Sequence, residues 1–249
     1  MHYELTDETR TNSAGVVLHR IRALTDLPAH RVSAGEPGGW VDTATLADGT
    51  PRITSGAWVG GEAELYGNAR ATGSAAITGR ARVCGDAIVC DDARVRGQAR
   101  VGGRARILNY GVVAGRARVD GLATVSDEAS VDGNARATDS ASVRGMSQVT
   151  DRARISGYAQ LYGCARLAGD AHLYGDAQMC GYSRASEQAE MCGNARVLRD
   201  AIIAGRTLIC GDTRVVSDDL PAWQQVENAV TLGASTDTAL LVGNAGTGD

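Results

Sequence analysis

Apolar and polar positions recur along residues 57–216 with a fixed period of six. The third residue of each six-residue unit, from Val59 to Val215, is Val, Ile, Leu, Met or Ala in all 27 units, with no insertion or deletion between them. A short fixed period means that each unit is one part of a stacked array and cannot bury its apolar face alone. We therefore predict that this column faces the interior of a repeat protein.

Two further columns follow the same period. The first residue is Ala in 22 units and is otherwise small: Gly111, Ser147, Ser183, Thr207 and Thr213. The fifth residue is Gly in 19 units and otherwise mostly Asp or Asn, which tolerate positive φ: Asp91, Asn109, Asp127, Asp139 and Asp151. These columns predict a small-residue corner and a tight turn in every unit. Strained or differently shaped turns are predicted at Glu187, Arg199 and Ser217.

A period of six fits neither an amphipathic helix nor a hairpin ladder. Units such as Ala-Arg-Val-Cys-Gly-Asp at 81–86 and Ala-His-Leu-Tyr-Gly-Asp at 171–176 resemble the hexapeptide-repeat family. The resemblance implies an all-β, single-stranded, left-handed parallel β-helix with three units per triangular coil. We therefore expect about nine coils and, with strands ~4.8 Å apart, a rod roughly 43 Å long.

Residues 1–56 do not repeat and are predicted to form an N-terminal β cap, with a strand-like run at 16–24 and a loop that returns to a strand at 35–41. The run Leu-His-Arg-Ile-Arg-Ala-Leu-Thr-Asp at 18–26, followed by Gly-Gly-Trp-Val at 38–41 and then by the repeats, resembles the leader of the YdcK-like transferase group. An open β-helix end exposes unpaired backbone groups and needs a cap. Trp40 and Trp58 are expected to pack this cap onto the first coil.

Residues 217–249 are predicted to form a C-terminal cap, with strands at 230–233 and 239–242 and a mobile tail at 243–249. The acidic, polar start of the chain does not have the pattern of a signal peptide. No apolar run is long enough to span a bilayer. A cytoplasmic protein without membrane contact is expected.

Cysteines are scattered along the repeat rather than paired as CxxC, which favours reduced thiols in small-residue positions and no metal site. The six are Cys84, Cys90, Cys164, Cys180, Cys192 and Cys210. Cys192 and Cys210 are 18 residues apart and should be stacked neighbours. A disulfide between them is an open alternative.

With 18 residues per coil, two adjoining outward columns form a stripe of eight arginines. Five lie in one column, Arg82, Arg100, Arg118, Arg136 and Arg154, and three in the column two residues earlier, Arg80, Arg116 and Arg152. All 25 basic residues are Arg, whose planar fork suits carboxylate, sulfate and phosphate. Residues 57–216 carry 20 Arg and 17 acids, a charge of +3, while the ends carry 5 Arg and 12 acids, a charge of −7. The stripe could bind a polyanion, or its members could be solvated or paired with acids. Stacking aromatics are missing beside it, which disfavours sequence-specific nucleic-acid recognition.

The family that the repeats resemble is best known for acyl transfer from acyl-CoA by a histidine base, often in trimers. His172 is the one histidine of the repeat, and Glu190 lies one coil further, where it could orient the imidazole. An acyltransferase using His172 with acetyl-CoA is therefore the alternative function. The unbroken array offers no loop that would close a pocket, so no cofactor is expected for the leading hypothesis.

Tyrosines make the C-terminal half of the repeat more apolar outside, which suggests a contact surface. They are Tyr158, Tyr162, Tyr174 and Tyr182. The leading hypothesis is a non-catalytic β-helical scaffold or binding module that self-associates, with a trimer favoured.

Overall fold

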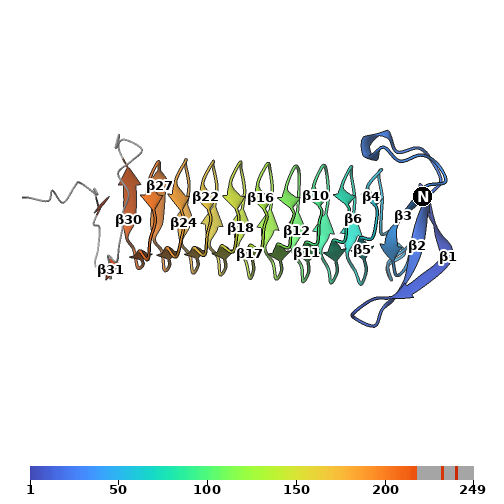
Figure 1. Ribbon diagram of the computed structural model, residues 1–249, viewed down its shortest axis with the longest axis horizontal. Helices are drawn as coiled ribbons and strands as arrows, with labels where there is room; N and C mark the ends of the chain where they lie inside the picture. Colours follow the sequence, from blue (N-terminus) through green and yellow to red (C-terminus); the bar gives the residue numbers. More distant parts are fainter. Residues whose placement is uncertain (218–230, 233–238, 241–249) are drawn as a thin grey trace, which may run out of the picture.

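The computed structural model describes residues 1–217, 231–232 and 239–240. The chain forms an all-β rod, a left-handed parallel β-helix of about nine coils (Figure 1). Three sheets make the three sides of the rod, and antiparallel strands form a cap at its N-terminal end. The predicted fold class is confirmed.

The strands of each sheet follow one another along the rod, and nearly all those of the repeat are two residues long. In spatial order, sheet 1 contains β1 (Tyr3–Thr11), β2 (Val17–Ala23), β3 (Pro37–Val41), β5 (Glu64–Leu65), β8 (Arg82–Val83), β11 (Arg100–Val101), β14 (Arg118–Val119), β17 (Arg136–Ala137), β20 (Arg154–Ile155), β23 (His172–Leu173), β26 (Glu190–Met191), β29 (Leu208–Ile209) and β31 (Thr231–Leu232). Sheet 2 contains β6 (Arg70–Ala71), β9 (Ile88–Val89), β12 (Arg106–Ile107), β15 (Thr124–Val125), β18 (Ser142–Val143), β21 (Gln160–Leu161), β24 (Gln178–Met179), β27 (Arg196–Arg199), β30 (Arg214–Ser217) and β32 (Ala239–Leu240). Sheet 3 contains β4 (Trp58–Val59), β7 (Ala76–Ile77), β10 (Arg94–Val95), β13 (Val112–Val113), β16 (Ser130–Val131), β19 (Gln148–Val149), β22 (Arg166–Leu167), β25 (Arg184–Ala185) and β28 (Ile202–Ile203).

The register of the parallel ladders shows that one coil takes 18 residues. Arg100 of β11 pairs with Arg82 on one side and with Arg118 on the other. The N–H group of Arg100 donates to the carbonyl of Ala117 in the next coil at 2.9 Å. Because this pattern repeats without a register break from β5 to β29, residues 18 apart lie above one another along the rod.

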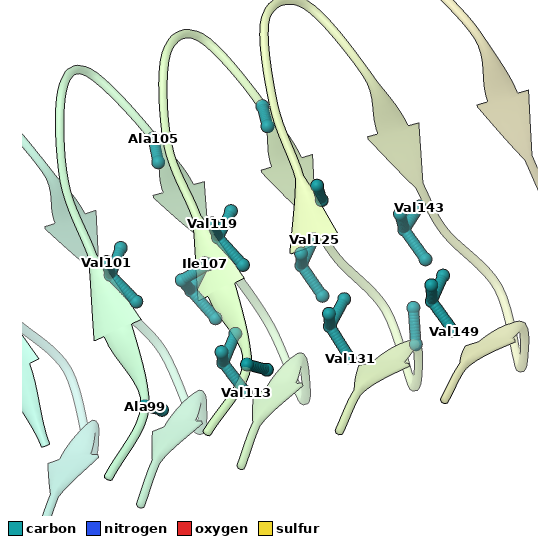
Figure 2. Packing of buried hydrophobic residues seen from close by; sticks show 14 of the residues in the cluster. Ala99, Val101, Ala105, Ile107, Val113, Val119, Val125, Val131, Val143 and Val149 are labelled. Atoms are coloured by element: carbon teal, nitrogen blue, oxygen red, sulfur yellow. The ribbon is translucent and has the colours of Figure 1, made fainter. Parts of the chain in front are cut away.

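The core is built from the two inward columns. In each two-residue strand of the repeat, the second side chain points inward, as successive residues of a strand face opposite ways. Val101, Val119 and Val125 are 1%, 0% and 0% exposed. The alanines at the corners, such as Ala99 and Ala105, are also fully buried, and the aliphatic side chains stack from coil to coil (Figure 2).

The turns hold their fifth residue in the left-handed region, as predicted. Where Asp replaces Gly, its carboxylate accepts the N–H group of the residue 18 positions later, at 3.0–3.1 Å; the donors are those of Asn109, Gly145, Gly157 and Gly169. Glu187 and Arg199 keep the same conformation, with φ of 61° and 58°. The backbone of the turn therefore has the same shape at these two positions. The predicted strain is that of a residue other than Gly, Asp or Asn held at positive φ. Ser217 is the last residue of β30.

The N-terminal cap extends sheet 1 past the first coil. Strands β1 and β2 form an antiparallel hairpin, β2 pairs antiparallel with β3, and β3 joins the first coil in parallel at β5. A short 3-10 helix, η1 (Pro28–His30), lies between β2 and β3. Trp40 and Trp58 are 4% and 3% exposed, which confirms that they pack at this junction.

Side chains of the cap bind carbonyl groups at the start of the repeat. The Nε2 atoms of His2 and His30 lie 2.9 and 2.8 Å from the carbonyl oxygens of Ala57 and Gly56. The guanidinium of Arg52, which is 1% exposed, donates to the carbonyl of Ala69 at 3.1 Å. These contacts satisfy backbone groups that a preceding coil would otherwise bind.

At the other end, β31 pairs with β29 and β32 with β30, both parallel. The predicted tail at 243–249 lies outside the described residues. Within the described ranges, no helix has the length and apolar character needed to cross a membrane.

Candidate functional site

The most distinctive surface feature is a row of arginines on sheet 1, which we call the arginine ladder. Arg82, Arg100, Arg118, Arg136 and Arg154 are the first residues of β8, β11, β14, β17 and β20. Their side chains face outward because the next residue of each strand occupies the core. The ladders pair these arginines in register, so the structure brings the five predicted residues into one column.

A second row lies in the turns that precede these strands. Arg80, Arg116 and Arg152 alternate there with Gln98 and Asn134, which hold the same position in the intervening coils. Most of the two rows line one shallow groove of about 300 Å³, which we call the arginine groove; its residues are Arg80, Arg82, Gln98, Arg100, Arg116, Arg118, Asn134 and Arg136. Arg152 and Arg154 continue the two rows beyond it.

Few acids neutralise these arginines. Arg82 lies 3.4 Å from the Glu64 carboxylate, and Arg152 lies 2.7 Å from that of Asp170. In the described part of the chain, no ion pair is found for the other six members of the predicted stripe. Like charges directly opposite one another in a sheet destabilise it. The ladder thus keeps an unfavourable positive charge exposed on one side of the rod.

A second depression of about 320 Å³ borders the ladder on the other side. It forms where Gly102 leaves a gap in the outward column between Cys84 and Asp120, beside Arg100 and Arg118. The guanidinium groups at the centre of the ladder are therefore accessible from both sides. Tyr66 also lines this depression, so the prediction that no aromatic side chain lies beside the stripe is wrong.

His172 occupies the position after Arg154 in the same column and pairs in register with Arg154 and with Glu190. Its Nε2 atom lies 3.0 Å from the Ser156 hydroxyl, and its ring lies against that of Tyr174, with centroids 4.5 Å apart. Burial lowers the pKa of His172, Arg154 lowers it further, and the Glu190 carboxylate opposes the change. A neutral imidazole near pH 7 follows.

Glu190 contacts the tyrosine rather than the imidazole. The Tyr174 hydroxyl donates to Glu190 Oε2 at 3.5 Å, whereas the described contacts include no hydrogen bond between Glu190 and His172. Burial, with the nearby Glu190 carboxylate, raises the pKa of Tyr174. Sequence reasoning did not identify Ser156, although it stands 16 residues before His172 and therefore lies close to it in the preceding coil.

The four predicted contact tyrosines border sheet 2 on both sides. Tyr158 and Tyr174 follow strands of sheet 1, at the corner that leads into sheet 2, whereas Tyr162 and Tyr182 follow strands of sheet 2. Tyr158 and Tyr182 are 68% and 67% exposed. Tyr162 lies under the guanidinium of Arg144, 4.9 Å from its ring centroid.

The cysteines differ from the predicted set of reduced thiols at one place. Cys192 and Cys210 form a disulfide, with Cα atoms 4.5 Å apart in adjacent coils. The stacking of these two residues was predicted, and the bond was the alternative to free thiols. The other four cysteines are free, and burial raises the pKa of Cys90 to about 11. The described residues contain no cluster of His, Cys, Asp or Glu suited to a metal ion.

No protein-family model matches the chain, and no curated protein matches it.

Proposed function

We propose that the protein is a non-catalytic β-helical scaffold that binds linear polyanions along its arginine ladder. The observation that carries the proposal is a group of six arginines, arranged in two parallel rows on one side of the rod, for which the described part of the chain provides no acidic partner. A bound polyanion would relieve the repulsion between these arginines and release its own counterions. Guanidinium groups can bind carboxylate, sulfate or phosphate through two parallel hydrogen bonds.

The rigid rod favours such binding because it fixes the spacing of the cations before the ligand arrives. Each arginine of the ladder begins a strand that hydrogen bonds to both neighbouring coils, so its backbone is not ordered by binding. A preorganised surface loses less conformational entropy on association than a flexible basic segment does.

The test is retention on immobilised heparin and polyphosphate at low and rising salt. The variant Arg100→Gln with Arg118→Gln removes two neighbouring members of the ladder. The matched control is Arg166→Gln with Arg184→Gln, which removes two neighbouring exposed arginines from sheet 3 with the same change in net charge. We expect the salt slope of binding to fall by about two only in the first variant. No retention of the natural chain at low salt would contradict the proposal.

We also propose that the scaffold self-associates through sheet 2, with a trimer favoured. Its outward column from Ser142 to Gln178 carries no charge, and tyrosines border it on both sides. Light scattering across micromolar concentrations is expected to show an oligomer, and Tyr158→Ser with Tyr182→Ser is expected to weaken it. A strict monomer at all concentrations would rule this out.

A second candidate is acyl transfer with His172 as general base. The pairing of His172 with the Ser156 hydroxyl and its lowered pKa favour this function, since a base must be unprotonated near neutral pH. Stabilisation by acetyl-CoA in a thermal-shift assay, lost in His172→Ala, would support the enzyme. No shift with acetyl-CoA would leave the scaffold as the only candidate.

A further inference from the structure

We propose that the arginine groove takes a particular class of polyanion: an extended acidic polysaccharide whose successive sugars are flipped relative to one another. This inference rests on the proposed binding of polyanions and specifies the ligand. It comes from the order of charged and uncharged side chains along the groove.

The two rows of the groove have different periods. Within the groove, the ladder presents an arginine in every coil, whereas the neighbouring row presents Arg80, Gln98, Arg116 and Asn134 in successive coils. Each coil advances by ~4.8 Å, so the neighbouring row repeats every ~9.6 Å. The ligand should therefore present an anionic group and an uncharged polar group alternately along that edge.

The amides add a chemical requirement that arginines do not. Gln98 and Asn134 are exposed, and in the described structure their side chains make no hydrogen bond with the protein. An amide offers an acceptor as well as a donor, whereas arginine only donates. The acceptor is used fully only if the ligand carries hydroxyl or amide donors between its anionic groups.

A chain of uronic acids joined through equatorial bonds meets both requirements. Its sugars are flipped at each step, so carboxylates and hydroxyls alternate along either edge. One sugar of such an extended chain advances by about the length of one coil. Carboxylates would then face Arg80 and Arg116, and hydroxyls would face the two amides.

Other polyanions fit less well. Polyphosphate has no donors for the amide oxygens along its length, and its charges do not alternate with uncharged groups. Single-stranded nucleic acid is generally held by aromatic side chains that stack on its bases, and none of the residues lining the groove is aromatic.

The experiment compares three probes of equal charge by fluorescence anisotropy at one low salt concentration: a β-1,4-linked oligomannuronate, a linear polyphosphate and an oligothymidylate. We expect the oligomannuronate to bind most tightly. The variant Gln98→Leu with Asn134→Leu is expected to weaken that binding about tenfold and to leave polyphosphate binding unchanged. Gln188→Leu, at the same position of a later coil beyond the groove, is the control and should change neither.

The outcomes separate this inference from the proposed function. If none of the three probes binds, the proposed polyanion binding is wrong. If polyphosphate or oligothymidylate binds as tightly as oligomannuronate, or the amide variant weakens all three equally, polyanion binding stands and the polysaccharide assignment is overturned.

Discussion

At the scale of single residues, the repeat depends on the left-handed conformation at the fifth position of each unit. Gly121 has φ of 72°, and a Cβ atom there would lie 2.8 Å from both the N and O atoms of Asp139 in the next coil. The contact is with backbone and cannot be relieved by rotating a side chain. Asp139 itself is left-handed, but its carboxylate accepts the N–H group of Gly157 at 3.0 Å. Glycine and aspartate thus meet the same requirement by different means.

The first prediction follows from this contrast. Gly121→Ala should lower the free energy of unfolding by about 1–3 kcal/mol, since it adds both a close backbone contact and an unfavourable φ. Asp139→Asn should cost less than about 1 kcal/mol, because asparagine tolerates this conformation and keeps an acceptor. Urea unfolding of both variants measures the difference, and equal losses would contradict it.

The second prediction concerns His172 and pH. Because its pKa lies below the ordinary value of 6.5, the unfolded chain binds a proton more readily than the folded chain. Stability from this residue is complete above pH 6.5 and falls as the pH is lowered through that value toward the folded pKa. We expect His172→Gln to flatten the dependence of the melting temperature on pH in this range. An NMR titration midpoint of His172 above 6.5 would contradict the argument.

At the scale of elements, each two-residue strand separates an outward role from a core role. In β14, Arg118 is exposed and belongs to the ladder, whereas its neighbour Val119 is completely buried. The outward residue of a strand can therefore be substituted to suit a ligand without disturbing the inward residue, which stabilises the coil. This separation explains how a row of like charges persists on a stable fold.

The third prediction tests this separation. Val119→Ala should lower the free energy of unfolding by about 1–3 kcal/mol because it leaves a cavity in a closely packed core. Arg118→Ala should leave stability unchanged or raise it slightly at low salt, because it removes a repulsive neighbour of Arg100 and Arg136. Denaturant midpoints at low and high salt measure both effects. A large loss of stability in Arg118→Ala would show that the ladder stabilises the rod.

The sequence predicted the elements of the repeat, because a period of six without gaps leaves one register for the coils. The sequence did not predict β1. Only Tyr3 of this strand is fully buried, so its other residues can be polar and show no pattern of apolar positions. The column that contains His172 was predicted, but its contacts were not. Whether an imidazole meets Ser156 or Glu190 depends on side-chain rotamers, which a repeat period does not specify.

At the scale of the whole molecule, the rod is held mainly by contacts between adjacent coils, so a local link stabilises mainly its own coils. The Cys192–Cys210 disulfide is such a link and joins two adjacent coils near the C-terminal end of the repeat. The bond closes a loop with a sequence separation of 18 residues, which stabilises the folded chain by about 3 kcal/mol in the chain-entropy estimate.

The fourth prediction is that this bond forms in the purified, air-oxidised protein and stabilises its C-terminal coils. Peptide mapping without reductant should recover the linked pair, and Cys192→Ser with Cys210→Ser should increase hydrogen exchange in the last coils. Cys84→Ser with Cys90→Ser is the control, since both of these thiols are free. Alkylation of Cys192 and Cys210 before reduction would contradict the assignment.

The absence of any insertion between residues 57 and 216 also limits how such a gene can change in length. Duplicating 18 codons would lengthen the rod by one coil and leave every later side chain on the same side of the rod. Duplicating only six would turn everything downstream by one third of a revolution, so that a ladder begun on one sheet would continue on another. Selection for an uninterrupted charged track would therefore favour growth and loss in whole turns.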